Sequence, residues 1–249
     1  MNRIRREQIK KYIESKGVAT IKELRELFPA VSLMTLHRDL SALEEMGIIT
    51  KYRGGVRSVR QLDDIEFNIR MRENTAGKMS MMKKAMKLLR PQSSIFLDAS
   101  TSNIILARHF PDMKVNVTTI SPNIALELCR LSGATVDLCG GAMNPRTLSV
   151  SGIKTLEHLE KINIDLAFIG VSGCSSEVGF TCGTEADMLI KRLVIGKART
   201  SVVLCGADKL RRLMPYTFAA ISDVDYIISD EPLPEDFVRR CEASGVKIL

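Results

Sequence analysis

The segment 32–55, SLMTLHRDLSALEEMGIITKYRGG, constrains the fold of this 249-residue chain more than any other. Ser32 is a favoured N-cap residue, because its hydroxyl accepts a hydrogen bond from a free backbone N–H of a first helical turn. The apolar residues that follow recur at every third or fourth position and so share one face of a helix: Leu36, Leu40, Leu43 and Met46. Gly47 comes next, where a left-handed C-cap is usual. The sequence therefore predicts a helix between Ser32 and Gly47.

The other face of this helix is polar and basic in its first turns, which a buried core does not need. Residues 48–55 follow as two short strands around a tight turn, and Lys51 and Arg53 make this hairpin basic. Such a helix and hairpin are typical of a winged helix-turn-helix, in which the helix enters the DNA major groove and the hairpin contacts phosphate. The predicted DNA-binding residues are Ser32, Met34, Thr35, His37, Arg38, Lys51 and Arg53.

The preceding residues supply the rest of this domain. Apolar spacing predicts a first helix over 3–15, with Ile4, Ile9 and Ile13 on its apolar side. Thr20 and Glu23 form a capping-box pattern that opens a second helix over 21–28, and Pro29 ends it. The inward-facing residues expected there are Leu24, Leu27 and Phe28. We expect a DNA-binding domain over 1–58 whose helix-turn-helix motif spans 20–39.

The positive charge of the chain is concentrated in this domain. The formal net charge is +7, and residues 1–60 carry 13 Lys and Arg against 7 Asp and Glu. The other 189 residues carry 23 Lys and Arg against 22 Asp and Glu, so their charges nearly cancel. Positive charge gathered on one small domain indicates that this domain binds a polyanion.

The rest of the chain has a different sequence pattern. Residues 59–75 are polar and mixed in charge and are expected to be a linker, and a helix is expected over 76–89, closed by Pro91. Apolar runs then alternate with helical segments, which is typical of strands buried on both faces of a largely parallel α/β sheet. The predicted strands are 94–98, 114–120, 135–139, 165–170, 200–205, 226–229 and 246–249. We expect one α/β domain over 76–249.

Small and hydroxyl residues follow several of these strands at their carboxyl ends, where ligands of such sheets bind. Backbone N–H groups, hydroxyls and helix N-termini favour an anion. Each loop alone is also compatible with an ordinary strand-to-helix turn, but their convergence on one edge predicts a site for a small phosphorylated ligand. The candidate residues are Asp98, Ser100, Thr101, Ser102, Ser121, Gly140, Gly141, Gly170, Glu185 and Lys209.

Both halves resemble the DeoR family of bacterial transcriptional regulators. In the first half the matching residues are Ser32, Thr35-Leu36-His37-Arg38-Asp39-Leu40, Leu43-Glu44, Gly47 and Gly54-Gly55, with His37 where the family usually has arginine. In the second half they are Leu97-Asp98-Ala99-Ser100-Thr101, Thr119-Ile120-Ser121, Gly140-Gly141, Gly179-Phe180-Thr181 and Asp208-Lys209. The resemblance implies a sensor domain related in fold to ribose-5-phosphate isomerase and the CoA transferases. It implies that Asp98 and Lys209 hold sugar hydroxyls or phosphate, and that the Ser100-Thr101 loop holds the phosphate.

Two other classes of function are weighed against a regulator. A sugar-phosphate isomerase with an accessory DNA-binding domain needs a carboxylate base near its substrate, and the loop 169–173 contains no acid. Glu185 and Asp187 lie nearby in sequence, but in a helix-start context where acids are common. The second alternative is a constitutive architectural DNA-binding protein, but such a protein would have no function for the sensor-type sheet. We therefore expect a non-enzymatic regulator, a repressor of a carbohydrate-metabolism operon whose operator binding responds to a phosphorylated sugar or related metabolite.

The remaining expectations concern cofactors, partners and compartment. The six cysteines show no CxxC pair and fall mostly in apolar runs, so buried reduced thiols are expected and neither a metal nor a cofactor is. No signal peptide and no apolar run of about 18 residues is found, which predicts a cytoplasmic protein without a membrane partner. The expected partners are double-stranded operator DNA, the small-molecule effector and further copies of this chain, in a dimer or tetramer.

Overall fold

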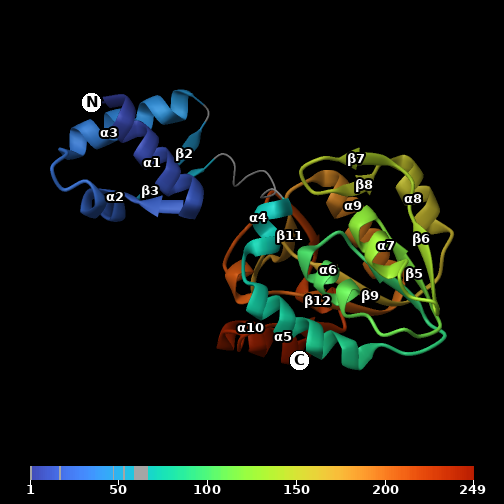
Figure 1. The fold of residues 1–249 in the computed structure, drawn as a ribbon. Helices are drawn as coiled ribbons and strands as arrows, with labels where there is room; N and C mark the ends of the chain where they lie inside the picture. The colour runs from blue at the N-terminus through green and yellow to red at the C-terminus, as the bar shows by residue number, and fades with distance from the viewer. Residues whose placement is uncertain (1, 17, 47, 53, 59–66) are drawn as a thin grey trace. The chain divides into compact units, whose positions relative to one another are not determined.

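The computed structural model describes residues 2–16, 18–46, 48–52, 54–58 and 67–249. The chain divides into two compact units, Met1–Ile65 and Glu66–Leu249 (Figure 1). Helix α4 (Phe67–Arg72) lies in the segment expected to be a linker, but it belongs to the second unit. The reason is apolar packing, because Phe67 and Met71 contact the core of that unit.

The first unit contains three helices and a small antiparallel sheet. The helices are α1 (Asn2–Lys16), α2 (Ile21–Leu27) and α3 (Leu33–Glu45). The strands are β1 (Val18–Thr20), β2 (Ile49–Tyr52) and β3 (Gly55–Ser58), in the order β1-β3-β2. The predicted helix-turn-helix and hairpin are confirmed. Strand β1 was not expected, because three residues between two helices give no periodic signal.

The core of this unit forms where the apolar faces of the three helices meet. Leu36, Leu40 and Leu43 of α3 are buried as predicted, together with residues of α1, α2 and the sheet. Three residues expected to face inward are instead exposed by about half or more: Ile4 (69%), Leu27 (47%) and Met46 (61%). Each lies at or just beyond a helix end, where helical spacing no longer decides which residues are covered by a neighbouring element.

The second unit is built on a seven-stranded sheet in which every neighbouring pair is parallel. The strand order is β15-β14-β12-β9-β4-β5-β6. The strands are β4 (Ser94–Leu97), β5 (Val115–Thr119), β6 (Ala134–Leu138), β9 (Ile164–Gly170), β12 (Ala198–Leu204), β14 (Tyr226–Ile228) and β15 (Lys247–Ile248). All seven correspond to the predicted strands within a few residues.

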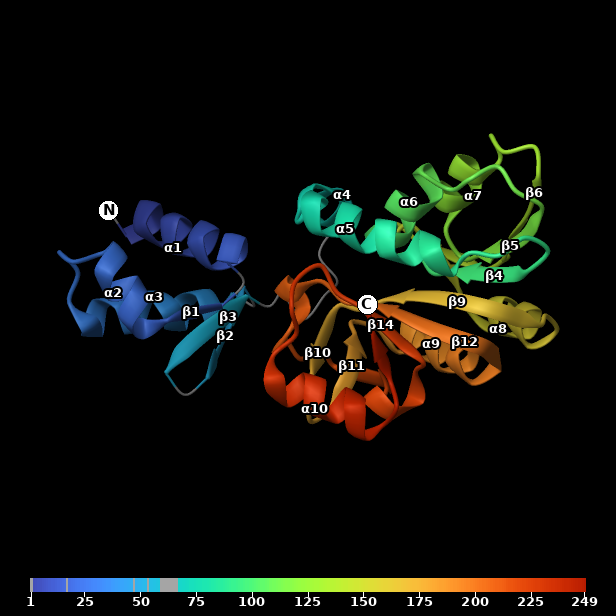
Figure 2. The same ribbon diagram turned by 90° about the horizontal axis from the view of Figure 1, so that it is seen from below.

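Helices cover both faces of this sheet (Figure 2). One face carries α5 (Thr75–Ala85), α6 (Thr101–Arg108) and α7 (Pro122–Leu128). The other carries α8 (Ile153–Glu160), α9 (Glu185–Lys197) and α10 (Glu235–Ala243). Successive side chains of a strand point to opposite faces of the sheet. Ile95 and Leu97 of β4 therefore pack in the core under α5, α6 and α7, whereas Phe96 packs in the core under α8, α9 and α10.

Short strands that the sequence did not predict extend the loops beyond the carboxyl ends of the main strands. One hairpin is formed by β7 (Ala142–Asn144) and β8 (Ser149–Ser151). A second antiparallel sheet is formed by β10 (Gly173–Ser175), β11 (Gly179–Cys182) and β13 (Tyr216–Ala219). The 3-10 turns are η2 (Met86–Leu88), η3 (Ala207–Lys209) and η4 (Ile221–Asp223). Within the described residues, no helix has the length and apolar character needed to cross a membrane.

Candidate DNA-reading surface and effector site

The start of α3 presents the predicted DNA-reading face to solvent. Ser32 caps the helix, because its Oγ accepts a hydrogen bond from the Thr35 backbone N–H at 3.2 Å and lies 2.9 Å from the Thr35 Oγ1. Met34 is 74% exposed, His37 and Arg38 are exposed, and Thr35 is half-buried. The apolar face of the helix is buried and this polar face is free, which is the geometry a groove-reading helix requires.

Asp39, next to this face, fixes α3 against α1. Its carboxylate is buried and lies 2.6 Å from the Arg5 Nε and 2.8 Å from the Arg6 Nε. Burial raises the pKa of Asp39, but the two guanidinium groups outweigh burial and hold that pKa below its ordinary value. Sequence reasoning missed this pairing, because the partners lie in different helices. Two arginines of the basic first unit are thus used to orient the reading helix.

Lys51, whose contact with DNA stays a prediction, also makes polar contacts within the first unit. Its Nζ lies 3.2 Å from the Glu44 Oε2 and donates to the Ser41 Oγ at 2.7 Å, and its backbone N–H donates to the Glu44 Oε1 at 2.9 Å. These contacts with Lys51 hold the pKa of Glu44 below its ordinary value. Lys51 therefore anchors β2 to α3, and its charge is already paired. Arg53 and Gly47 lie outside the described residues.

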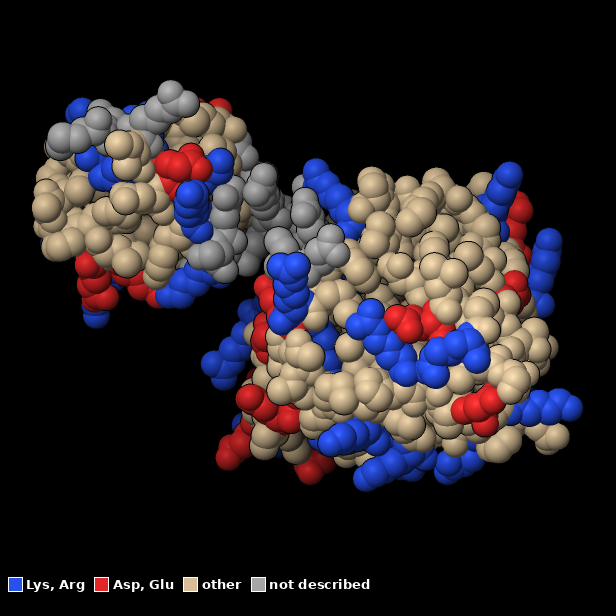
Figure 3. Space-filling model, viewed as in Figure 1, with Lys and Arg blue, Asp and Glu red and all other residues tan. Residues whose placement is uncertain are grey.

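Charge alone does not single out a surface on the face of the molecule drawn in Figure 3. On the face drawn in Figure 3, both units show lysine and arginine side chains interspersed with acidic ones. The exposed first turns of α3 are therefore the candidate DNA-reading surface of the first unit.

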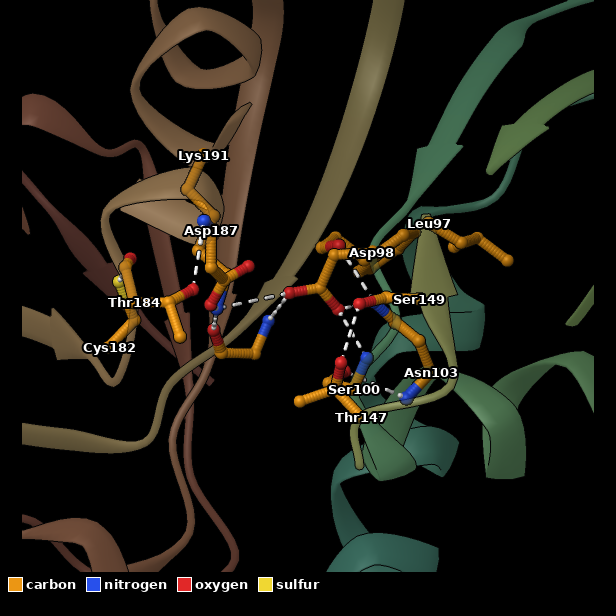
Figure 4. Close-up of polar contacts among 12 residues, drawn as sticks. Leu97, Asp98, Ser100, Asn103, Thr147, Ser149, Cys182, Thr184, Asp187 and Lys191 are labelled. Carbon is orange, nitrogen blue, oxygen red and sulfur yellow. Dashed lines mark hydrogen bonds and ion pairs between the residues drawn. The ribbon is translucent and has the colours of Figure 1, made fainter. Parts of the chain in front are cut away.

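In the second unit, Asp98 organises the carboxyl edge of the sheet (Figure 4). It follows β4 and is 1% exposed. Its Oδ1 accepts from the Ser100 N–H at 2.9 Å and the Asn103 Nδ2 at 2.8 Å, and its Oδ2 accepts from the Gly170 N–H at 2.9 Å. The Lys191 Nζ lies 3.6 Å from the same Oδ2. The structure therefore corrects the role expected for Asp98: its oxygens are committed to protein groups, so it positions the site rather than binding sugar hydroxyls.

Lys191 is a buried cation that sequence reasoning missed. It is 4% exposed, and its Nζ lies 2.9 Å from the Asp187 Oδ2 and donates to the Gly170 carbonyl at 2.9 Å. Burial lowers the pKa of Lys191, but Asp187 and Asp98 outweigh burial and raise that pKa above its ordinary value. The side chain stays charged and joins α9 to the ends of β4 and β9. In the sequence, a lysine four residues after an aspartate in a helix is indistinguishable from a surface pair.

The predicted hydroxyl residues fall into two groups. Ser100 and Ser121 are helix caps: their hydroxyls accept from the Asn103 N–H at 3.3 Å and the Ile124 N–H at 3.4 Å, and Ser121 is 1% exposed. Thr101 and Ser102 lie in the first turn of α6, with Thr101 buried and Ser102 half-buried. The structure thus assigns Ser121 a structural position and leaves the start of α6 as the part of this set with an accessible hydroxyl.

Gly170 is required by its close approach to the start of α6. A Cβ added at this residue would lie 2.3 Å from the Ser100 Cβ and 2.7 Å from the Ser100 Oγ. Any side chain at residue 170 would therefore displace the loop that precedes α6.

The β7–β8 hairpin brings two more hydroxyls to this edge. The Thr147 Oγ1 lies 2.7 Å from the Ser149 Oγ, and Figure 4 shows both residues beside Ser100. Both are half-buried. Gly140 and Gly141, which precede this hairpin, are exposed as a ligand-facing loop requires. Sequence reasoning missed Thr147 and Ser149, because the short hairpin that carries them gave no strand signal.

Glu185 and Lys209 complete the predicted set. Glu185 is exposed at the start of α9, whose N-cap Thr184 accepts from the Asp187 N–H at 3.2 Å. Lys209 is half-buried in η3, and its Nζ lies 2.6 Å from the Asp208 Oδ2. Lys209 belongs to a second polar cluster, at the carboxyl ends of β12 and β14, which consists of Asn74, Asp208, Lys209 and Asp230.

The cysteines and acidic residues give no sign of metal chemistry. No group of three or more His, Cys, Asp or Glu side chains within the described ranges is arranged to hold a metal ion. All six cysteines are free, and all but Cys129 are buried as expected. Burial raises the pKa of Cys139 to about 12 and that of Cys241 to about 11, so both remain protonated thiols near neutral pH.

A helix-turn-helix with an exposed reading face, followed by an α/β unit with a polar carboxyl edge, defines a DNA-binding transcription regulator with a sensor domain. The model of the DeoR-like helix-turn-helix domain matches residues 5–62, and that of the DeoR C terminal sensor domain matches residues 73–231. The chain belongs to the DeoR family. It is therefore a transcription regulator and not an enzyme, as expected, and the predicted family resemblance is confirmed.

Individual relatives agree with this assignment. The chain is 30% identical to the transcriptional regulator GlpR of Haloferax volcanii, over 88% of this chain and 86% of the relative. It is 31% identical to the regulator YgbI of Escherichia coli, over 98% and 96% of the two chains. It is also 30% identical to the transcriptional repressor GlcR of Bacillus subtilis, over 88% and 85%.

Solved structures with similar folds include ribose 5-phosphate isomerase A of Methanocaldococcus jannaschii and eIF2B delta of Chaetomium thermophilum. For the isomerase the TM-score is 0.41 at 16% identity, over 55% of each chain. For eIF2B delta the TM-score is 0.46 at 11% identity, over 67% of this chain and 61% of the other.

Proposed function

We propose that this protein represses a carbohydrate-metabolism operon and that a phosphorylated sugar or related metabolite changes its affinity for the operator. The observation that carries the effector half of this proposal is the first turn of α6 at the carboxyl edge of the sheet, where Ser102 is half-buried, together with the exposed glycines 140 and 141 that follow β6. Free backbone N–H groups and the helix dipole favour a phosphate at such a turn. The repressor half is supported by relatives such as GlcR, which is named as a transcriptional repressor.

Residues have distinct roles in this proposal. Thr101 and Ser102 of the first turn of α6, together with Thr147 and Ser149, surround the phosphate, while Asp98 holds the surrounding loops in place. Lys209 provides a cation for the anionic ligand, and Glu185 accepts a hydroxyl of the sugar. Glycines 140, 141 and 170 allow close backbone approach.

The DNA-binding unit reads one half-site per chain in this proposal. Ser32, Met34, Thr35, His37 and Arg38 face the groove, and Arg53 contacts phosphate. Two or four copies of the chain assemble, so that two reading helices meet the two halves of an operator. Such a protein acts in the cytoplasm, where its operator lies. The effector changes operator affinity by its differential preference for two arrangements of the units, typically about 1–3 kcal/mol.

The test is a panel of sugar phosphates measured against the matching free sugars. We expect one phosphorylated compound to raise the melting temperature of the protein, because a ligand that binds only the folded state stabilises it. The same compound should change operator affinity in a fluorescence anisotropy titration. A Ser102→Ala variant should lose part of the thermal shift without losing operator binding.

Different results separate the alternative functions. Operator binding that no compound of the panel changes would favour a constitutive architectural protein. Turnover of ribose 5-phosphate that Glu185→Gln abolishes would overturn the regulator in favour of an isomerase.

A further inference from the structure

Asn74 lies at the centre of the second polar cluster. It precedes α5 and caps it, because its Oδ1 accepts from the Gly77 N–H at 3.1 Å. Its Nδ2 donates in the other direction, to the Asp230 Oδ2 at 2.7 Å and to the Asp208 Oδ1 at 3.4 Å. A cap uses only the amide oxygen. The amide nitrogen therefore makes contacts that a helix cap does not require.

The two carboxylates follow neighbouring strands of the sheet. Asp230 follows β14, and its Oδ1 accepts from the Ala207 N–H at 2.7 Å. Asp208 lies in η3 after β12, and its Oδ2 lies 2.6 Å from the Lys209 Nζ. Burial raises the pKa of Asp208, but Lys209 and the Asn74 amide outweigh burial and hold that pKa below its ordinary value. One amide thus ties the start of α5 to the loop that carries Lys209, through Asp208, and to the loop after β14, through Asp230.

The same helix turn holds α4. Lys78 is 7% exposed, and its Nζ donates to the carbonyls of Arg70 and Glu73, at the carboxyl end of α4. Helix α4 is the first described element of the second unit after residues 59–66. Lys78 therefore joins the first turn of α5 to the carboxyl end of α4, the helix whose amino end follows residues 59–66.

The contact between α5 and Asp230 leaves no free space. A Cβ added at Gly77 would lie 2.1 Å from the Asp230 Oδ2 and 2.4 Å from the Asn74 Oδ1. Asn74 itself has φ +43°, a left-handed conformation that asparagine tolerates better than most residues. Both residues are therefore suited to hold the helix start close to the Lys209 loop.

We infer that Asn74 is a positioning residue that fastens the start of α5 to the Lys209 loop and so couples this loop to α4. The inference rests on the proposed function for one step, in which an anionic ligand draws Lys209 away from Asp208. That change alters the Asp208 contact with Asn74. The fastening of α5 and α4 then depends on whether the ligand is bound.

The first test needs no effector. Amide hydrogen exchange is measured on the full chain and on Asn74→Asp, which keeps the acceptor for the Gly77 N–H but has no N–H to donate. We expect exchange about tenfold faster at Ala207 and Lys209, because Asp230 and Asp208 lose the hydrogen bonds from the Asn74 amide that hold this loop in place. The control is Asn163→Asp, the same change at an exposed residue that precedes β9, at the other edge of the sheet. It should leave these amides unchanged.

A second variant separates fastening from capping. Gly77→Ala keeps the Asn74 amide but forces the helix away from Asp230, so exchange should also rise at Ala207. Faster exchange confined to residues 75–78 in Asn74→Asp would show that Asn74 is only a helix cap. That result, or unchanged exchange throughout, overturns the inference.

The ligand step uses inorganic phosphate at fixed ionic strength as the probe. In the wild type, phosphate should change exchange at both 206–210 and 67–78, whereas in Asn74→Asp it should change exchange at 206–210 alone. Equal changes at both segments in both proteins would overturn coupling through Asn74. If phosphate changes no exchange rate in the wild type, Lys209 is not an anion contact, and this part of the proposed function fails. The ligand-free comparison of the wild type with Asn74→Asp still tests the positioning role of Asn74.

Discussion

The Lys191 Nζ lies 3.6 Å from the Asp98 Oδ2, and both side chains are at least 94% shielded from solvent. The pair links the end of β4 to α9 across the carboxyl edge of the sheet. Asp187 and the Gly170 carbonyl complete the surroundings of the ammonium. A buried charge with this many partners is stable only while the partners remain.

Asp98→Asn should therefore destabilise the second unit strongly. The substitution leaves Lys191 with one acidic partner and places an amide in a position that accepts three N–H groups. We expect a loss of about 3–5 kcal/mol in the free energy of unfolding, measured by urea denaturation. The control is Glu127→Gln, which breaks the exposed pair with Arg108 and should cost about 0–1 kcal/mol. Equal losses in the two variants would contradict the organising role of Asp98.

Lys78 should make stability depend on pH in the alkaline range. Burial lowers the pKa of Lys78 to about 8 from the ordinary 10.5. Between these values the unfolded chain binds more protons than the folded chain, so the contribution of Lys78 to the free energy of unfolding rises with pH. Lys78→Met should remove this rise. Urea denaturation from pH 7 to pH 10 measures it, with Lys83→Met, an exposed lysine of the same helix, as the control. A wild-type curve parallel to that of Lys78→Met would refute the prediction.

The sequence predicted the large features of this fold because their signals are local. Continuous apolar runs marked all seven parallel strands, and Ser32 with the leucines of α3 marked the reading helix and its exposed face. Strands β7, β8, β10, β11 and β13 are only three or four residues long and carry no such signal. The prediction of buried residues was also wrong at helix ends, as at Met46, because periodicity gives no information on tertiary contacts there.

The sequence indicated which loops meet at the carboxyl edge of the sheet, but not the hydrogen bonds and ion pairs between their side chains. The loops at the carboxyl ends of β4 and β9 could be assigned because strand order places them together. The partners of Asp98 could not, because Lys191 lies in another helix and Asn103 resembles an ordinary helical residue. Similarly, the basic hairpin indicated that Lys51 contacts DNA, while its pairing with Glu44 depends on how β2 packs against α3.

The two basic residues of the hairpin should differ in their contribution to DNA binding. A phosphate contact adds about one to the slope of log affinity against log salt concentration. We expect Arg53→Ala to weaken binding to all sequences alike and to reduce this slope by about one. Lys51→Ala should reduce it less, because Glu44 already pairs with its charge. Anisotropy titrations at several salt concentrations measure both slopes, and equal reductions would contradict the anchoring role of Lys51.

Residues on the reading face of α3 should instead change which sequences are bound. Thr35→Ala and His37→Ala are expected to alter the preference among operator variants, because base-edge contacts carry sequence information and phosphate contacts do not. The measurement is the ratio of affinities for a set of single-base operator variants. An equal loss of affinity for every variant would remove these residues from the groove.

Two glycine substitutions should change stability in opposite directions. Gly170→Ala places a Cβ 2.3 Å from the Ser100 Cβ, and relieving this overlap should cost about 1–3 kcal/mol. Gly196→Ala, in the last turn of α9, meets no atom within 4 Å and should stabilise the protein by about 0.5–1 kcal/mol, because alanine loses less backbone entropy in a helix. Thermal unfolding compares the two variants. Because Ser100 begins the turn proposed to hold phosphate, Gly170→Ala should also reduce the thermal shift caused by a bound sugar phosphate, and an unchanged shift would place the phosphate elsewhere.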